Sequence, residues 1–167
     1  MKEQSNLWPT NEPAAVPTPV GLPTRALTLW QPWAWLVANS HKDIENRPSG
    51  FSFKSFRGEF WIHAGLQHAT DLRARELCAR MGITIPLLTG PDHFGAIIGR
   101  ATITAIIPPC ADSGMQCPHP WHFPAQWGFR VVDARPVKPV RCRGFQGFWG
   151  VPAQVLAELA ANETGNG

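Results

Sequence analysis

The chain has 167 residues, 44% of them hydrophobic and 16% charged, with a formal net charge of +3. This composition fits one globular domain with a core of its own and excludes a wholly disordered chain. There is no run of about 18 apolar residues and no pattern of a secretory signal at the N-terminus, so we expect a cytoplasmic protein without a membrane span.

The N-terminal part of the chain changes character near residue 25. Residues 1–24 are rich in proline among small and polar side chains, which predicts a disordered arm that could dock a protein partner. A short strand should follow over residues 25–29. It leads into a segment from Trp30 to Val37 that contains three tryptophans, and Pro32 suits the first turn of a helix there.

A heavily charged, strand-like stretch runs from Lys42 to Arg47 directly after this helix. In an ideal strand Glu45 and Arg47 share a face, whereas residues 42 and 45 point to opposite faces. Lys42 and Glu45 therefore converge only if the strand begins after Lys42 or carries a bulge. The alternative to a ligand site here is an ion pair on the rim of the sheet.

Two further elements follow before residue 82. Residues 58–64 alternate in the way expected of a half-buried strand, with Glu59, Trp61 and His63 on one face. A helix is predicted from Thr70 to about residue 80, with Thr70 as its N-cap and Gly82 as its stop.

The remainder of the chain is β-rich. Residues 95–107 form a β-branched run with internal glycines, which predicts a strand that bends or bulges. Residues 128–133 and 137–140 are expected to pair, followed by a strand over 148–151, a helix over 153–161 and a frayed tail over 163–167. Together the elements predict an α+β domain over 25–162, in which five or six strands could close into a small β-barrel with two or three flanking helices.

The four cysteines form no Cys-x-x-Cys pair, so we expect reduced, partly buried thiols. Cys110, Cys117, His119 and His122 do fall within 13 residues of one another. The gap between the two cysteines is longer than is usual in zinc sites, and three prolines in this stretch favour a loop. We therefore expect neither a metal site nor a cofactor.

Several separated motifs resemble one family over about residues 26–152. They are Leu-Trp-Gln-Pro-Trp-Ala at 29–34, the spacing of Lys42, Glu45 and Arg47, Arg-Gly-x-Phe-Trp-Ile-His-Ala at 57–64, and the glycine-containing segments at 95–99 and 143–149. In these motifs the chain resembles the ASCH domain, named for homology to an activating signal cointegrator, a branch of the PUA-like superfamily. The resemblance implies a PUA-like β-barrel with a cleft beside its first helix, and an association with RNA.

The resemblance implies more than one activity. Some members of the family resemble nucleases, and one branch hydrolyses the acetyl group of N4-acetylcytidine with a lysine and, three residues later, a threonine nucleophile. Lys42 matches the lysine, but Glu45 stands in place of the threonine. A carboxylate cannot replace an activated hydroxyl in acyl transfer without a change of mechanism. Nucleoside amidohydrolysis is therefore the alternative to ribonuclease activity.

The candidate catalytic residues are Lys42, Glu45 and His63. A lysine desolvated by neighbouring tryptophans could have a lowered pKa and act as a general acid or base. His63 could transfer protons in metal-independent cleavage of a phosphodiester, and His41 is a second candidate of the same kind. A lone histidine in a strand is, however, more often a structural group.

The candidate nucleic-acid-binding residues are two in the tryptophan segment and four arginines: Trp30, Gln31, Arg47, Arg57, Arg100 and Arg143. Trp30, just before the helix, is better placed to stack on a base than Trp33, which has the spacing of a packed face. We expect RNA or a nucleotide-like ligand to bind between the helix over 30–37 and the strand over 42–47. A non-catalytic interaction module remains a third possibility.

Overall fold

The computed structural model describes residues 21–48, 55–69, 72–110, 117 and 119–164 of the chain. Most of the predicted N-terminal arm lies outside these ranges, as do Thr70, the predicted helix N-cap, and the end of the C-terminal tail. Within these ranges, every helix is too short or too polar to span a lipid bilayer.

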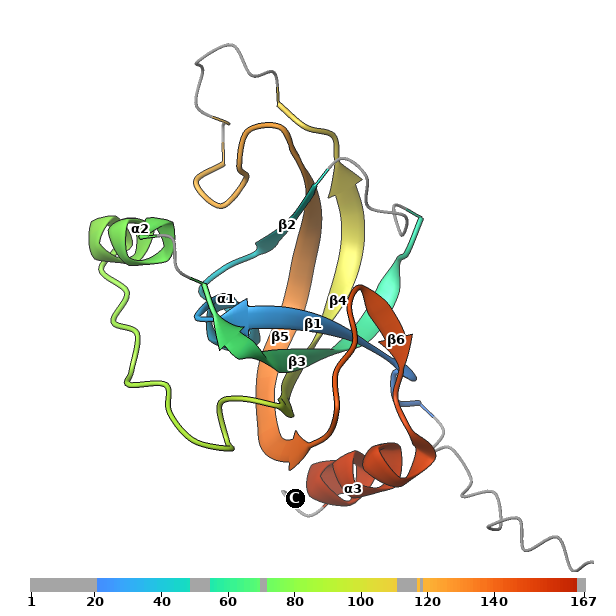
Figure 1. Cartoon of the computed structure of the whole chain (residues 1–167). Coiled ribbons are helices and arrows are strands. Elements are labelled where there is room, and N and C mark those ends of the chain that lie inside the picture. The colour runs from blue at the N-terminus through green and yellow to red at the C-terminus, as the bar shows by residue number, and fades with distance from the viewer. Residues whose placement is uncertain (1–20, 49–54, 70–71, 111–116, 118, 165–167) are drawn as a thin grey trace, which may run out of the picture.

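Six strands form one mixed sheet in the order β2-β5-β4-β3-β1-β6 (Figure 1). The strands are β1 (Arg25–Gln31), β2 (Ile44–Pro48), β3 (Gly58–His68), β4 (Ala96–Ile107), β5 (Gln126–Arg141) and β6 (Phe148–Gly150). β1 and β3 run parallel, and the other neighbouring strands run antiparallel. With the three helices of the described ranges, this arrangement confirms the predicted α+β class.

The predicted closure into a barrel is wrong. β1 and β3 lie across β4 and β5, so the sheet is strongly curved (Figure 1). β2 and β6 nevertheless share no ladder in the described part of the chain. These end strands have only five and three residues, which leaves little backbone with which to complete a cylinder.

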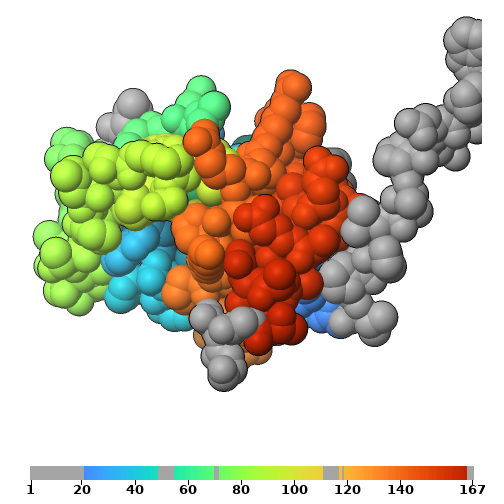
Figure 2. All heavy atoms as spheres, turned by 90° about the horizontal axis from the view of Figure 1, so that it is seen from below, coloured from blue at the N-terminus to red at the C-terminus, as the bar shows by residue number. Residues whose placement is uncertain are grey.

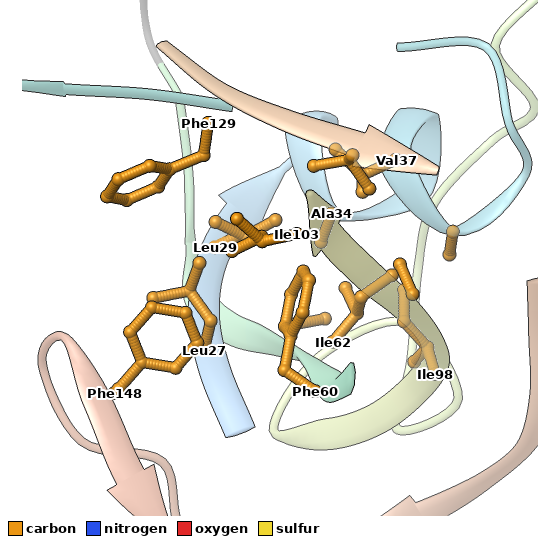
Figure 3. Packing of buried hydrophobic residues seen from close by; sticks show 14 of the residues in the cluster. Leu27, Leu29, Ala34, Val37, Phe60, Ile62, Ile98, Ile103, Phe129 and Phe148 are labelled. Carbon is orange, nitrogen blue, oxygen red and sulfur yellow. The ribbon is translucent and has the colours of Figure 1, made fainter. Parts of the chain in front are cut away.

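The first helix, α1 (Trp33–Ala38), packs against four strands of the sheet. Its buried residues Ala34 and Val37 meet a cluster that includes Leu27, Phe60 and Ile103 (Figure 3). The helix approaches β4 closely at Gly99, where a Cβ would lie only 2.8 Å from the Cβ of Ala38. A glycine in β4 is therefore needed for this packing.

The C-terminal helix, α3 (Ala153–Thr164), packs on the face of the sheet opposite to α1. In the view from below, α3 and β5 lie side by side (Figure 2). Leu156 and Leu159 of α3 form a second cluster with Trp61 of β3, while Phe60 and Ile62 face the first cluster. The prediction of a half-buried strand over 58–64 is therefore wrong, because clusters on both faces of the sheet cover β3.

Two other predicted elements differ from the structure. Residues 128–133 and 137–140 do not pair with each other but belong to the single strand β5, both halves of which pair with β4. β5 keeps its direction through Asp133, which has a φ of 51°, and through Pro136. The irregular residues are accommodated by shifts of register in the pairing of β5 with β4. The helix α2 (Arg73–Met81) ends, as predicted, at Gly82 in the left-handed conformation.

Candidate functional site

A buried ion pair joins Lys42 and Glu45 beside α1. The side chain of Lys42 is only 1% exposed, and its Nζ lies 2.7 Å from Oε2 of Glu45. Nζ also donates a hydrogen bond to the carbonyl oxygen of Ile44. β2 begins at Ile44, so the condition under which residues 42 and 45 converge, a strand that starts after Lys42, is met.

The surroundings of Lys42 act on its protonation in opposite directions. Burial lowers the pKa of Lys42 from its usual 10.5, and the Glu45 carboxylate opposes this effect. Nζ lies 5.6 Å from the centroid of the Trp33 ring, a distance at which the ring favours the cation. An ammonium that is easier to deprotonate than in water is a feature of sites that transfer protons.

Arg47 extends the pair into a short charge network. Its Nη2 lies 3.4 Å from Oε1 of Glu45 and donates a hydrogen bond of 3.2 Å to the carbonyl oxygen of Thr28. The carboxylate therefore lies between a lysine and an arginine. The hydrogen bond from Arg47 to Thr28 also connects β2 to β1, two strands that are not neighbours in the sheet.

These charges line a cavity of about 490 Å³, which we call the Lys42 cleft. Trp30, Trp33 and Phe123 supply its aromatic walls, and Arg73 contributes a further cation. The wall that carries Phe123 is fixed by the side chain of Asn46. Its Nδ2 donates to the carbonyl oxygen of Trp121, and its Oδ1 accepts from the N–H of Phe123, both at 2.8 Å.

A second cavity of about 940 Å³ adjoins the first, and we call it the Arg143 cleft. Thr28, Trp30 and Arg47 line both clefts. The Arg143 cleft is also lined by Arg143 and Phe145. Trp30 is 53% exposed and Phe145 is 50% exposed, so two large rings are available to a ligand. The sequence drew attention to Trp30 but not to Phe145, which stands in a glycine-rich loop without a pattern of its own.

His63 is held as a structural group on the floor of the Arg143 cleft. It is 2% exposed, with Nδ1 3.2 Å from Oγ1 of Thr28 and Nε2 3.1 Å from the carbonyl oxygen of Cys142. Since a carbonyl only accepts, Nε2 carries the proton. Trp149 donates to the same Thr28 hydroxyl, which leaves its O–H to point at Nδ1. The neutral ring is fully satisfied.

Burial lowers the pKa of His63 below its usual 6.5, against the hydrogen bond to the Cys142 carbonyl, which raises it. Below pH 6.5 the unfolded chain takes up a proton at His63 that the folded chain does not bind. The contribution of this histidine to stability is therefore present above pH 6.5 and is lost as the pH falls towards its folded-state pKa.

Replacement of Gly144 by alanine is expected to lower the free energy of unfolding by about 1–3 kcal/mol. A Cβ at this position would overlap the His63 ring, whose farthest nitrogen, Nε2, would be only 2.9 Å away. The ring cannot yield without losing its contacts with Thr28 and Cys142. Urea unfolding at neutral pH measures the effect.

Gly150→Ala is the matched control, because no atom lies within 4 Å of a Cβ built on Gly150. An unchanged midpoint for Gly144→Ala, or equal losses for both variants, would show that the His63 ring is not held against residue 144.

Three predicted nucleic-acid-binding residues lie away from the cleft linings. Gln31 is fully buried, where its Oε1 accepts from the N–H of Trp35 and its Nε2 donates to the carbonyl oxygen of His93. Arg57 lies beside the start of β3. Arg100 approaches Glu163 of α3 at 3.4 Å. The structure thus brings together Trp30, Lys42, Glu45 and Arg47, with Arg143 and His63 in the adjoining cleft.

The expectation of four reduced thiols is wrong for two of them, because Cys110 and Cys117 form a disulfide. Their Cα atoms lie 5.9 Å apart, a usual separation for a bridge. Cys78 and Cys142 are free thiols. That the side chains of residues 110 and 117 meet is not visible in their spacing.

The sequence matches no protein-family model and no curated protein. Among solved structures, the ASCH protein from Zymomonas mobilis is similar, with a TM-score of 0.53 and 14% identity over 82% of this chain and 93% of that chain. A point variant of the same protein gives a TM-score of 0.50 and 14% identity over 82% and 96%. At this identity the likeness extends to the fold and no further.

Proposed function

We propose that this chain, which has the fold of the ASCH domain, binds single-stranded RNA along the Lys42 cleft and the Arg143 cleft. The observation that carries the proposal is the juxtaposition of cations with exposed aromatic rings in two cavities that share Trp30 and Arg47. The family resemblance of the sequence, which implies an association with RNA, points in the same direction.

The charges that line the two clefts favour a polyanion. Lys42, Arg47 and Arg73 face a single carboxylate, that of Glu45, in the Lys42 cleft. Arg47, Arg141 and Arg143 line the Arg143 cleft, and none of its described lining residues is acidic. Cations that follow a groove can track successive phosphates of one strand. The positions of the arginines therefore say more about binding of a polyanion than the net charge of +3 does.

The exposed aromatic rings provide surfaces on which bases can stack, which a patch of cations alone does not. Trp30 lines both clefts, and Phe145 lines the Arg143 cleft. The guanidinium of Arg143 lies 5.3 Å from the centroid of the Phe145 ring. At this distance the cation attracts the ring electrostatically and favours its observed orientation. Unpaired bases stack on aromatic side chains while the backbone runs along the cations, a mode open to single strands but not to a duplex.

The test is a salt titration of the affinity for labelled single-stranded RNA, with Trp30→Ala beside the wild type. The logarithm of the association constant should fall linearly with that of the salt concentration, by about 0.7 for each phosphate contacted. Trp30→Ala should lose about 1–3 kcal/mol of binding free energy for one stacked base and keep the same salt slope, because no charge is removed.

Leu87→Ala is the control for Trp30→Ala, since Leu87 is exposed but lines neither cleft. Binding that does not respond to salt would refute the polyanion model. An equal loss of affinity in Leu87→Ala and Trp30→Ala would refute stacking on Trp30.

Metal-independent cleavage of the bound RNA is a second candidate function. It is favoured by Lys42, whose buried ammonium has a lowered pKa and lines the cleft next to a carboxylate. Such a pair offers an acid and a base within one site. The nucleoside amidohydrolase alternative has less support, because the Glu45 carboxylate is held between Lys42 and Arg47 and presents no hydroxyl nucleophile.

A further inference from the structure

Two cysteines and a buried histidine meet beside α2, and none of the three belongs to the charge network of Lys42. The sulfurs of Cys110 and Cys117 and one ring nitrogen of His122 all lie within 4.8 Å of one another. We propose that the reduced chain binds one zinc-like divalent cation through these three atoms, and that the Cys110–Cys117 disulfide is the oxidised, metal-free form of the same site.

The hydrogen bonding of His122 prepares it as a ligand. Its Nε2 lies 2.9 Å from the carbonyl oxygen of Gln126, and because a carbonyl only accepts, Nε2 must carry the proton. The lone pair is then on Nδ1, so Nδ1 is the ring nitrogen that would bind the metal. A backbone carbonyl that fixes the tautomer in this way is the usual partner of a metal-binding histidine. His122 is buried, so its ring has few other orientations.

The donor set and the spacing suit zinc. Two thiolates and an imidazole form a borderline-soft set that favours Zn²⁺ over Mg²⁺ or Ca²⁺. With Zn–S bonds of about 2.3 Å in a tetrahedron, two ligand sulfurs lie about 3.8 Å apart. In the disulfide the two sulfurs are bonded, so after reduction they move apart to this distance, and the ring nitrogen of His122 already lies within 4.8 Å of both. Three protein ligands leave a fourth position for water.

His119 is not needed as the fourth ligand. Its Nε2 lies 3.3 Å from the Asp43 carboxylate, and its Nδ1 accepts from the N–H of Trp121 at 3.2 Å. A cavity of about 360 Å³, lined in part by Cys117 and His122, leads to the site. Solvent and a metal ion can therefore reach it.

The two forms of the site interconvert by balanced steps. A phosphine or thiol reductant gives two electrons to the disulfide, and two protons convert the sulfurs to thiols. The metal then displaces both protons as it binds. Hydrogen peroxide reverses the change: the two thiolates give up two electrons and the S–S bond forms. The O–O bond of the peroxide breaks and takes up two protons from solvent to give two water molecules, and the metal is released.

Metal binding would hold the segment that forms one wall of the Lys42 cleft. Phe123 follows His122 directly and packs edge-on against Trp33, with 5.8 Å between ring centroids. The assignment of the site does not depend on what binds in that cleft. Failure of the metal proposal would leave the RNA-binding proposal untouched, and the reverse also holds.

The experiment uses the full chain, reduced with a phosphine, stripped of metal and titrated with Co²⁺ as a spectroscopic substitute for Zn²⁺. We expect one ion for each chain, with a thiolate-to-cobalt charge-transfer band that Zn²⁺ abolishes. The same chain oxidised with peroxide should show no band. This comparison requires no substitution, so it holds even if a variant fails to fold.

Cys117→Ser should lose the charge-transfer band, whereas Cys142→Ser should keep it. Cys142 is a matched control because it is free and because burial raises the pKa of its thiol, against a backbone hydrogen bond with Ile97. Absence of the band in the reduced wild type would overturn the proposal. A band retained in Cys117→Ser, or lost in Cys142→Ser, would overturn it as well.

Discussion

Lys42→Met is expected to lower the free energy of unfolding by about 3–5 kcal/mol, the usual cost of breaking a buried ion pair from one side. Methionine fills much of the space of the lysine stem but donates no hydrogen bond. Oε2 of Glu45 and the carbonyl oxygen of Ile44 would each lose the donor that Nζ provides. Urea unfolding followed by circular dichroism measures the difference.

Two controls isolate the buried pair. In the double variant Lys42→Met/Glu45→Gln the carboxylate that has lost its lysine is also neutralised, so part of the loss should be regained, and the coupling follows from a double-mutant cycle. Arg135→Ala removes a half-exposed partner of Glu163 and should cost at most about 1 kcal/mol. A cost for Lys42→Met no greater than that for Arg135→Ala would show that the pair is not buried in solution.

Cleavage of labelled single-stranded RNA in the presence of EDTA is expected to fall at least about 100-fold in Lys42→Arg, if Lys42 acts as the general base. Arginine keeps the positive charge beside Glu45 but does not release a proton at any accessible pH. RNA affinity should therefore change much less than the cleavage rate. Equal cleavage by both proteins would exclude Lys42 and point to a contaminating nuclease.

The wild type alone provides a second readout of this role. Because burial lowers the pKa of Lys42 from 10.5, the neutral amine becomes populated at lower pH than for a lysine in water. The cleavage rate should rise with pH and level off before pH 10.5. A rate independent of pH over the range in which the protein stays folded would contradict the assignment of Lys42 as the base.

Sequence reasoning located the charge network because the network is local. Lys42, Glu45 and Arg47 lie within six residues, and the start of β2 at Ile44 was one of two conditions that strand geometry allowed. Gln31 and His63 show the limit of this approach. Both side chains are buried and donate to carbonyl oxygens of His93 and Cys142, partners that are remote in sequence.

The second cleft was not predictable for the same reason. Trp30 and Phe145 lie more than a hundred residues apart, and only the curved sheet brings them to one cavity. Arg57 and Arg100 were predicted from residue type alone, which does not indicate the face on which an arginine lies. The long strand β5 was divided in error at Pro136, since a proline in a strand normally marks an end, whereas here it falls at a shift of register.

The pairing of β1 constrains how the chain can fold during synthesis. Arg25 of β1 lies opposite Gly150 of β6, so one edge of β1 stays unpaired until residue 150 has been synthesised and has left the ribosome. Its other neighbour, β3, is parallel and also comes from further along the chain. Contacts of such long sequence separation slow folding. The apolar strand over residues 25–31 is thus the segment most in need of protection in the nascent protein.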